Sequence, residues 1–135
     1  MSEPAAAVLA LNRKLLAAIV AGDWATYADL CAPGMTCLEP EALGHVAVGL
    51  DFHKFYFDLP PSSPGEPVHA VVSMADVHIH ATDHMAVLAY IRLNQRSTGA
   101  TASTTAVEET RVWQKLEGGW KLVHTHRSPC STAGH

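Results

Sequence analysis

The first twenty positions carry apolar residues at the three- and four-residue intervals that place side chains on one helix face. The pattern predicts a helix over residues 4–21 ended by Gly22, and its apolar stripe consists of Val8, Leu11, Leu15 and Ile19. A second, shorter helix is predicted over residues 24–31, because Asp23 is in position to cap it. The chain therefore begins with helices that have one apolar side.

The middle of the chain mixes turn, strand and helix signals. Ala32-Pro33-Gly34 predicts a turn, and a short strand is expected from Met35 to Leu38. All three phenylalanines of the chain lie within residues 49–58, which favours a third helix packed on a sheet. Residues 60–67 hold four of the eight prolines and are predicted to form a loop.

The second half of the chain changes to the partial alternation that is typical of strands. Turn signals at Asp83, Gly99 and Gly118-Gly119 separate four strand-like segments, which cover residues 68–81, 84–96, 104–116 and 120–127. Helices followed by an antiparallel meander predict an α+β domain with its helices on one face of a curved sheet. Such a cone has one open end, where a ligand pocket can form.

Composition narrows the classes of function. The chain has 135 residues and a net charge of −4 without a Lys/Arg cluster, so a nucleic-acid partner is not expected. No apolar run approaches the roughly 18 residues of a membrane span, and the first residues are not typical of a signal peptide. Only 16% of the residues are charged, against about 25% in an average domain, so other subunits are expected to cover part of the surface.

The cysteines and histidines predict neither a disulfide framework nor a metal site. Three cysteines are an odd number, and they indicate buried thiols in a reducing compartment, the cytoplasm. The pairs His78/His80 and His124/His126 would each share a strand face, but no carboxylate or cysteine is placed beside either pair. We therefore expect no metal and no other cofactor.

Three arginines lie inside strand-like segments: Arg92, Arg111 and Arg127. One interpretation is that each points to solvent from the outer sheet face, because arginine is seldom buried without a partner. The other is a shared positive pocket for a carboxylate or an acidic peptide, which suits the fork of donors on guanidinium. Glu109 lies two residues before Arg111 on the same strand face and is the possible counter-ion.

The geometry of the turn near Gly118-Gly119 affects whether the arginines can share a pocket. If these two glycines form a two-residue loop, Arg111 lies opposite His126, and Arg111 and Arg127 point to opposite faces. If Glu117 also belongs to the loop and Gly119 is left-handed, Arg111 lies opposite Thr125 and shares a face with Arg127. Both registers are open at this point.

Catalytic motifs do not stand out. Acid/base candidates exist, but nothing in their spacing marks them as catalytic: Glu39, Glu41, Asp51, His53 and Tyr90. There is no phosphate-binding glycine loop and no H-R-D segment, so we expect no kinase activity from this chain.

Several motifs together resemble the association (hub) domain of calcium/calmodulin-dependent protein kinase II, in matching order over about residues 8–128. They are CAPGMTCLEPEALG, DFHKFYFD, AYIRLNQ, EETRVW and GGWKLVHTHRS. The broader fold group is similar to nuclear transport factor 2, ketosteroid isomerase and scytalone dehydratase, and is also called SnoaL-like. The resemblance implies a cone-shaped domain in which a long helix is wrapped by a strongly curved antiparallel sheet.

The resemblance also implies partners and site residues. Family hubs pair into dimers that build two stacked rings, and their deep pocket is lined by arginines, which correspond here to Arg92, Arg111 and Arg127. His53 falls where the family pocket contacts its ligand. Lys54 stands where the kinase hubs commonly have Arg, and the loop at 60–67 lacks a Trp that some hubs carry.

The sequence thus predicts one domain over residues 1–135, with a short flexible tail after about residue 128. Its expected function is self-association as a scaffold, with an anion or acidic-peptide pocket and no catalysis. The alternative is a small-molecule isomerase or dehydratase of the same fold group. The sequence as given begins just ahead of the first hub helix, so we expect either a stand-alone homologue or an excised domain.

Overall fold

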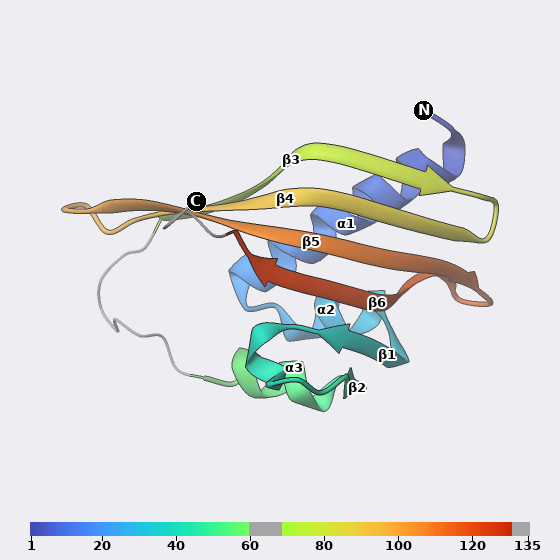
Figure 1. The fold of residues 1–135 in the computed structure, drawn as a ribbon, viewed down its shortest axis with the longest axis horizontal. Helices are drawn as coiled ribbons and strands as arrows, with labels where there is room; N and C mark the ends of the chain where they lie inside the picture. The colour runs from blue at the N-terminus through green and yellow to red at the C-terminus, as the bar shows by residue number, and fades with distance from the viewer. Residues whose placement is uncertain (60–68, 131–135) are drawn as a thin grey trace.

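Six strands form one curved sheet in the computed structural model, and the helices lie against one of its faces (Figure 1). The structure describes residues 1–59 and 69–130, so the loop predicted at 60–67 and the last residues of the predicted tail lie outside the described residues. The strand order is β2-β1-β6-β5-β4-β3. The elements are α1 (Glu3–Ala21), α2 (Trp24–Leu30), β1 (Cys31–Leu38), η1 (Pro40–Ala42), β2 (Ala47–Val48), α3 (Asp51–Phe57), β3 (His69–Ala81), β4 (Met85–Ser97), β5 (Ala102–Leu116) and β6 (Gly119–Pro129).

The long helix α1 forms where the apolar stripe predicted it. The Ser2 side chain caps it by accepting from the Ala5 N–H at 3.3 Å, and Gly22 ends it in the left-handed region at φ 67°. The stripe packs into the core, where Val8 and Leu15 are fully buried. By length and mean hydropathy α1 could also cross a membrane, so the expectation that no apolar segment approaches that length does not hold. Its buried stripe is the pattern of a helix in the core of a globular domain.

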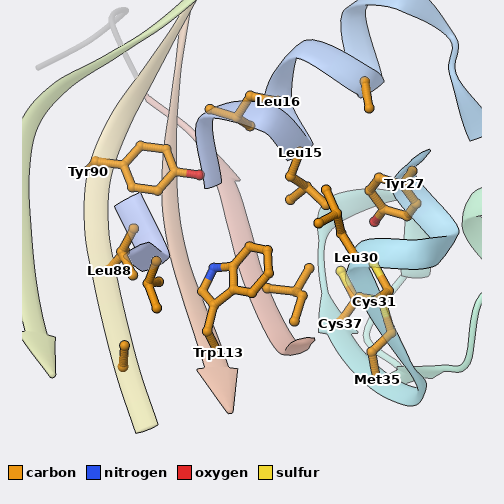
Figure 2. Close-up of a cluster of buried hydrophobic side chains, with 14 residues drawn as sticks. Leu15, Leu16, Tyr27, Leu30, Cys31, Met35, Cys37, Leu88, Tyr90 and Trp113 are labelled. Carbon is orange, nitrogen blue, oxygen red and sulfur yellow. The ribbon is translucent and has the colours of Figure 1, made fainter. Parts of the chain in front are cut away.

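The core lies between α1, α2 and the inner face of the sheet (Figure 2). Its largest fully buried side chains come from both layers: Trp113, Leu15, Leu16, Met35, Leu88 and Leu122. The alternation along β4 and β5 directs Leu88 and Trp113 toward α1 and directs the residues next to them in sequence to the opposite face. The helix and the sheet therefore hold each other in place through one continuous apolar layer.

The predicted meander is confirmed for β3 to β6, and β1 and β2 extend the sheet. The turn predicted at Ala32-Pro33-Gly34 is wrong, because β1 already begins at Cys31 and pairs in parallel with β6. The register of this pair is interrupted between Cys31 and Thr36, where proline cannot donate to the ladder. The two-residue strand β2 is too short to show a periodicity in the sequence.

The β5–β6 hairpin has neither of the two predicted loops. Leu116 pairs with Gly119, so the turn contains only Glu117 and Gly118, and both the Gly118-Gly119 loop and the three-residue loop are wrong. A bulge then shifts the register, because Trp113 pairs with Leu122 whereas Val112 pairs with His124. Beyond this bulge Arg111 lies opposite Thr125, which is the pairing that the longer loop had predicted.

A second bulge lies in β3, between Ala75 and His78, where Asp76 adopts a left-handed φ of 52°. Bulges bend a strand and increase its twist, so these two irregularities help the sheet curve around α1. At its end β6 stays attached to the sheet, because the Cys130 N–H donates to the Ala106 carbonyl at 3.1 Å. The sheet thus continues slightly beyond the predicted tail boundary.

The hairpin turn provides a first test, because Gly119 has a φ of +104° whereas Gly118 lies outside the positive region. We expect Gly119→Ala to lower the free energy of unfolding by about 1–2 kcal/mol, because a Cβ is unfavourable in this backbone conformation. Gly118→Ala is the matched control and should change it by less than about 1 kcal/mol. Equal destabilisation of both variants in urea unfolding would contradict the role assigned to Gly119.

Candidate functional site

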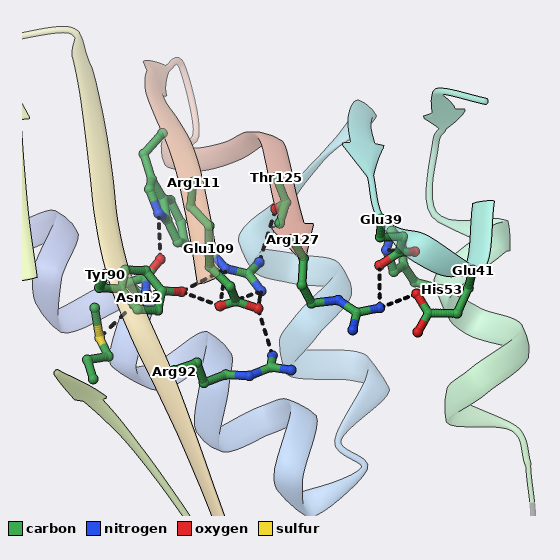
Figure 3. Close-up of polar contacts among 12 residues, drawn as sticks. Asn12, Glu39, Glu41, His53, Tyr90, Arg92, Glu109, Arg111, Thr125 and Arg127 are labelled. Atoms are coloured by element: carbon green, nitrogen blue, oxygen red, sulfur yellow. Dashed lines mark hydrogen bonds and ion pairs between the residues drawn. The ribbon is translucent and has the colours of Figure 1, made fainter. Parts of the chain in front are cut away.

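The three sequence-predicted arginines lie on three neighbouring strands, β4, β5 and β6, and their side chains project from the inner side of the sheet (Figure 3). All three line one cavity of about 220 Å³, and His53 from α3 lines it as well. The interpretation that each arginine points to solvent does not hold, since Arg111 is only 3% exposed. The bulge in β6 is the reason that Arg111 and Arg127 share a face.

The buried Glu109 forms ion pairs with two of these arginines. Its carboxylate lies 3.0 Å from Arg92 Nη1 and 3.3 Å from Arg111 Nη2, and the Tyr90 hydroxyl donates to it at 2.6 Å. Burial alone would raise the pKa of Glu109, but the charges of Arg111 and Arg92 and the hydrogen bond from Tyr90 lower it. The carboxylate therefore stays ionised, and it likewise raises the pKa of Arg111 well above its ordinary value against the effect of burial.

Asn12 of α1 connects this charged group to the core, and the sequence analysis missed it. Its side-chain amide donates to the Tyr90 hydroxyl at 3.1 Å and accepts from Trp113 Nε1 at 3.0 Å. Tyr90 also accepts from Arg111 Nε at 3.0 Å. A signal was present in the sequence, because Asn12 occupies a position of the apolar stripe between Val8 and Leu15, where a polar residue needs buried partners.

Arg127 has its own carboxylates, Glu39 and Glu41, which the sequence analysis considered only as acid/base candidates. Arg127 Nη2 lies 3.1 Å from Glu39 Oε2 and also contacts Glu41 Oε2 (Figure 3). Glu39 is further held by His53 Nε2 at 3.1 Å. Burial would raise the pKa of Glu39, but His53 and Arg127 outweigh it and lower this pKa to about 2. These counter-ions are hard to find in the sequence, because 88 residues separate Glu39 from Arg127.

Cys37, Glu39 and His53 have the donor types of a metal site, and their donor atoms lie within 4.8 Å of one another. Glu39 is already engaged by Arg127 and His53. Burial raises the pKa of the Cys37 thiol to about 12, so the thiolate that binds metals is disfavoured. The neighbouring guanidinium groups also oppose a second cation. The arrangement fits a hydrogen-bonded wall of the cavity better than a metal centre.

Aromatic side chains hold His53 at the cavity. The ring of Tyr27 lies 5.9 Å from that of His53 and 5.0 Å from that of Phe57, so α2 and α3 pack through these rings. The histidine pairs lie elsewhere, and the expectation that no carboxylate neighbours them is wrong for the first pair. His78 contacts Asp76 at 3.0 Å on the surface, and His124 bonds to Thr36 at 2.7 Å.

The shared carboxylate of Glu109 generates a second test. Glu109→Gln removes the charge that both Arg92 and Arg111 contact, and an unpaired buried charge costs about 3–5 kcal/mol of stability. Glu117→Gln is the matched control, because Glu117 is exposed in the turn that follows the same strand and lies off the outer sheet face. We expect urea unfolding at equal protein concentration to show a large loss for Glu109→Gln only. Equal unfolding midpoints for the two variants would contradict a structural role for Glu109.

Known proteins share both the sequence and the shape of this chain. The sequence model of the calcium/calmodulin dependent protein kinase II association domain matches residues 4–131. The delta subunit of that kinase from Oryctolagus cuniculus is 41% identical over 126 residues, which cover 93% of this chain. The chain spans only 24% of the length of that relative.

Two solved hub structures are similar over nearly their whole length. The hub homology domain from Chlamydomonas reinhardtii has 49% identity and a TM-score of 0.87, covering 97% of this chain and all of the other. The hub from S. rosetta has 40% identity and a TM-score of 0.80, covering 96% and 99%. A putative dehydratase of the nuclear-transport-factor-2-like family from Streptomyces avermitilis is 21% identical with a TM-score of 0.70, over 93% and 94% of the two chains, and shows the shared fold alone.

Proposed function

The chain belongs to the calcium/calmodulin-dependent protein kinase II association-domain family, and on this premise we propose that it is a non-catalytic hub. In this proposal it associates with copies of itself and holds a small carboxylate or an acidic peptide side chain among its arginines. The observation that carries the proposal is the near-complete match to hub domains. A reducing compartment such as the cytoplasm suits its cysteines, which are unpaired among the described residues.

The outer face of the sheet supports self-association. The helices lie on the other face, and no helix among the described residues covers this one (Figure 1). The alternation of β4 places four apolar residues along its centre: Val87, Ala89, Ile91 and Leu93. An apolar, uncovered sheet is the kind of surface that stable oligomers bury. Because closed symmetry satisfies every interface, we propose a ring, with two rings stacked back to back.

The assembly is tested by its mass in solution. We expect light scattering at micromolar concentration to give a closed oligomer of many subunits. Ile91→Glu should shift the population to smaller species, because it puts a charge into the proposed interface. Val20→Glu is the control, since Val20 is exposed on α1 and lies off this face. A monomer or a simple dimer of the unchanged protein would contradict the proposal.

The partly exposed guanidinium groups support the carboxylate pocket. Arg92 and Arg127 both line the cavity, and their side chains are 13% and 21% exposed. A small carboxylate in the cavity could therefore accept from either arginine, which is the contact that a guanidinium group favours. The volume of about 220 Å³ is below that of a typical drug-sized site. This size suits a small carboxylate or the end of one acidic side chain.

The same cavity favours a hub over the isomerase or dehydratase alternative. A general base works best with a pKa near the operating pH, but the pKa of Glu39 is lowered to about 2. Burial raises the pKa values of the neighbouring Tyr27 and Cys37, so neither ionises readily. We therefore assign these groups to binding and support.

The pocket is tested by a thermal-shift titration with succinate at constant ionic strength. A saturating carboxylate should raise the melting temperature by mass action, with about 2.7 kcal/mol available at one hundred times its dissociation constant. Arg127→Gln should reduce this shift, whereas Arg96→Gln should not, since Arg96 is exposed at the far end of β4. Arg127 is preferred to Arg111, because Arg111 also supports the fold. Identical shifts in the unchanged protein and Arg127→Gln would contradict the proposed site.

A further inference from the structure

The three guanidinium groups of the pocket are balanced by three carboxylates of the same chain. Glu109 pairs with Arg92 and Arg111, and Arg127 pairs with both Glu39 and Glu41, so the formal charges of the ion-paired groups cancel. An external carboxylate therefore does not enter an unpaired cationic site. To reach Arg127 it must replace a carboxylate that is already bound there.

The surroundings of the three glutamates identify which carboxylate can leave. The Glu109 side chain is 0% exposed, and that of Glu39 is 6% exposed and held by His53 as well as Arg127. The Glu41 side chain is 38% exposed, and Arg127 is its one ion-pair partner among the described residues. Releasing Glu41 into water breaks one contact, whereas releasing either of the others strands a buried charge.

The backbone at Glu41 also permits such a release. Glu41 lies in the three-residue turn η1, which is followed by Leu43 and Gly44 at positive φ. Leu43 is 84% exposed, whereas Ala42 is buried and anchors the turn. The Glu41 side chain itself is 38% exposed, so it can rotate into solvent while Ala42 stays in place. Such a rotation can free Arg127 from Glu41 without disturbing the sheet.

We propose that Glu41 is the competing anion of the pocket, and that its displacement from Arg127 sets the affinity for external carboxylates. This inference rests on the proposed carboxylate-binding function. A tethered carboxylate competes at an effective concentration in the millimolar range or above, so free ligands should bind weakly. An external carboxylate can still displace Glu41, because it can contact Arg127 and also the guanidinium group of Arg92, whose side chain lines the cavity and is 13% exposed.

The test is isothermal titration calorimetry with succinate at constant ionic strength. Glu41→Gln weakens the internal contact while keeping the side-chain shape, and we expect it to bind succinate about tenfold more tightly than the unchanged protein. Glu41→Asp keeps the charge on a shorter side chain, and it should also bind more tightly if the contact to Arg127 is what matters. Glu117→Gln removes one charge from the exposed β5–β6 turn and should bind as the unchanged protein does.

The outcomes separate this inference from the function on which it rests. Measurable succinate binding with the same affinity in the unchanged protein, Glu41→Gln and Glu41→Asp would overturn the role of Glu41 and leave the pocket intact. An equal gain in Glu41→Gln and Glu117→Gln, with none in Glu41→Asp, would assign the effect to net charge and also overturn it. Absence of binding in all variants would overturn the carboxylate pocket itself, and this inference with it. Melting curves of each variant establish that the proteins compared are folded.

Discussion

The rest of the site depends on one pair of contacts: the ion pairs that the buried Glu109 carboxylate makes with Arg92 and Arg111. Removing charges from water is costly unless each has a partner, so β4 and β5 must keep a register that brings these groups together. The Tyr90 hydroxyl accepts from Asn12 and Arg111 and donates to Glu109. One hydrogen-bonded network thus extends from the core helix to the pocket.

The two sides of the cavity differ in how deeply their charged groups are buried and in how many contacts hold them. On the inner side, Glu109 and Arg111 are buried and held by several bonds, and they support the fold as much as the site. On the outer side, Arg127 and Glu41 are partly exposed and joined by one contact. Rigid groups orient a ligand, whereas exchangeable ones admit it, so this division suits a binding site better than a purely structural ion cluster.

The two faces of the sheet would separate the proposed binding from the proposed assembly. Alternation along β4 directs Leu88, Tyr90 and Arg92 toward α1 and directs Ile91 outward. A ligand in the inner cavity and a second subunit on the outer face would therefore contact neighbouring residues of the same strands. A domain of 135 residues would in this way combine a ligand cavity with a surface for association.

Local patterns in the sequence determined the helices, the four meander strands and the α+β class, because helical spacing and turn residues act over a few positions. The motifs also identified the family and the three arginines. Strand alternation also placed Glu109 on the face of Arg111. Tertiary structure alone decided how the charge of Arg127 is balanced and that the three arginines meet. The parallel pairing of β1 with β6 brings Glu39 to Arg127, and the bulge in β6 turns Arg111 and Arg127 to one face. Neither follows from local periodicity, because an ion pair between distant segments depends on strand order and on a one-residue shift of register.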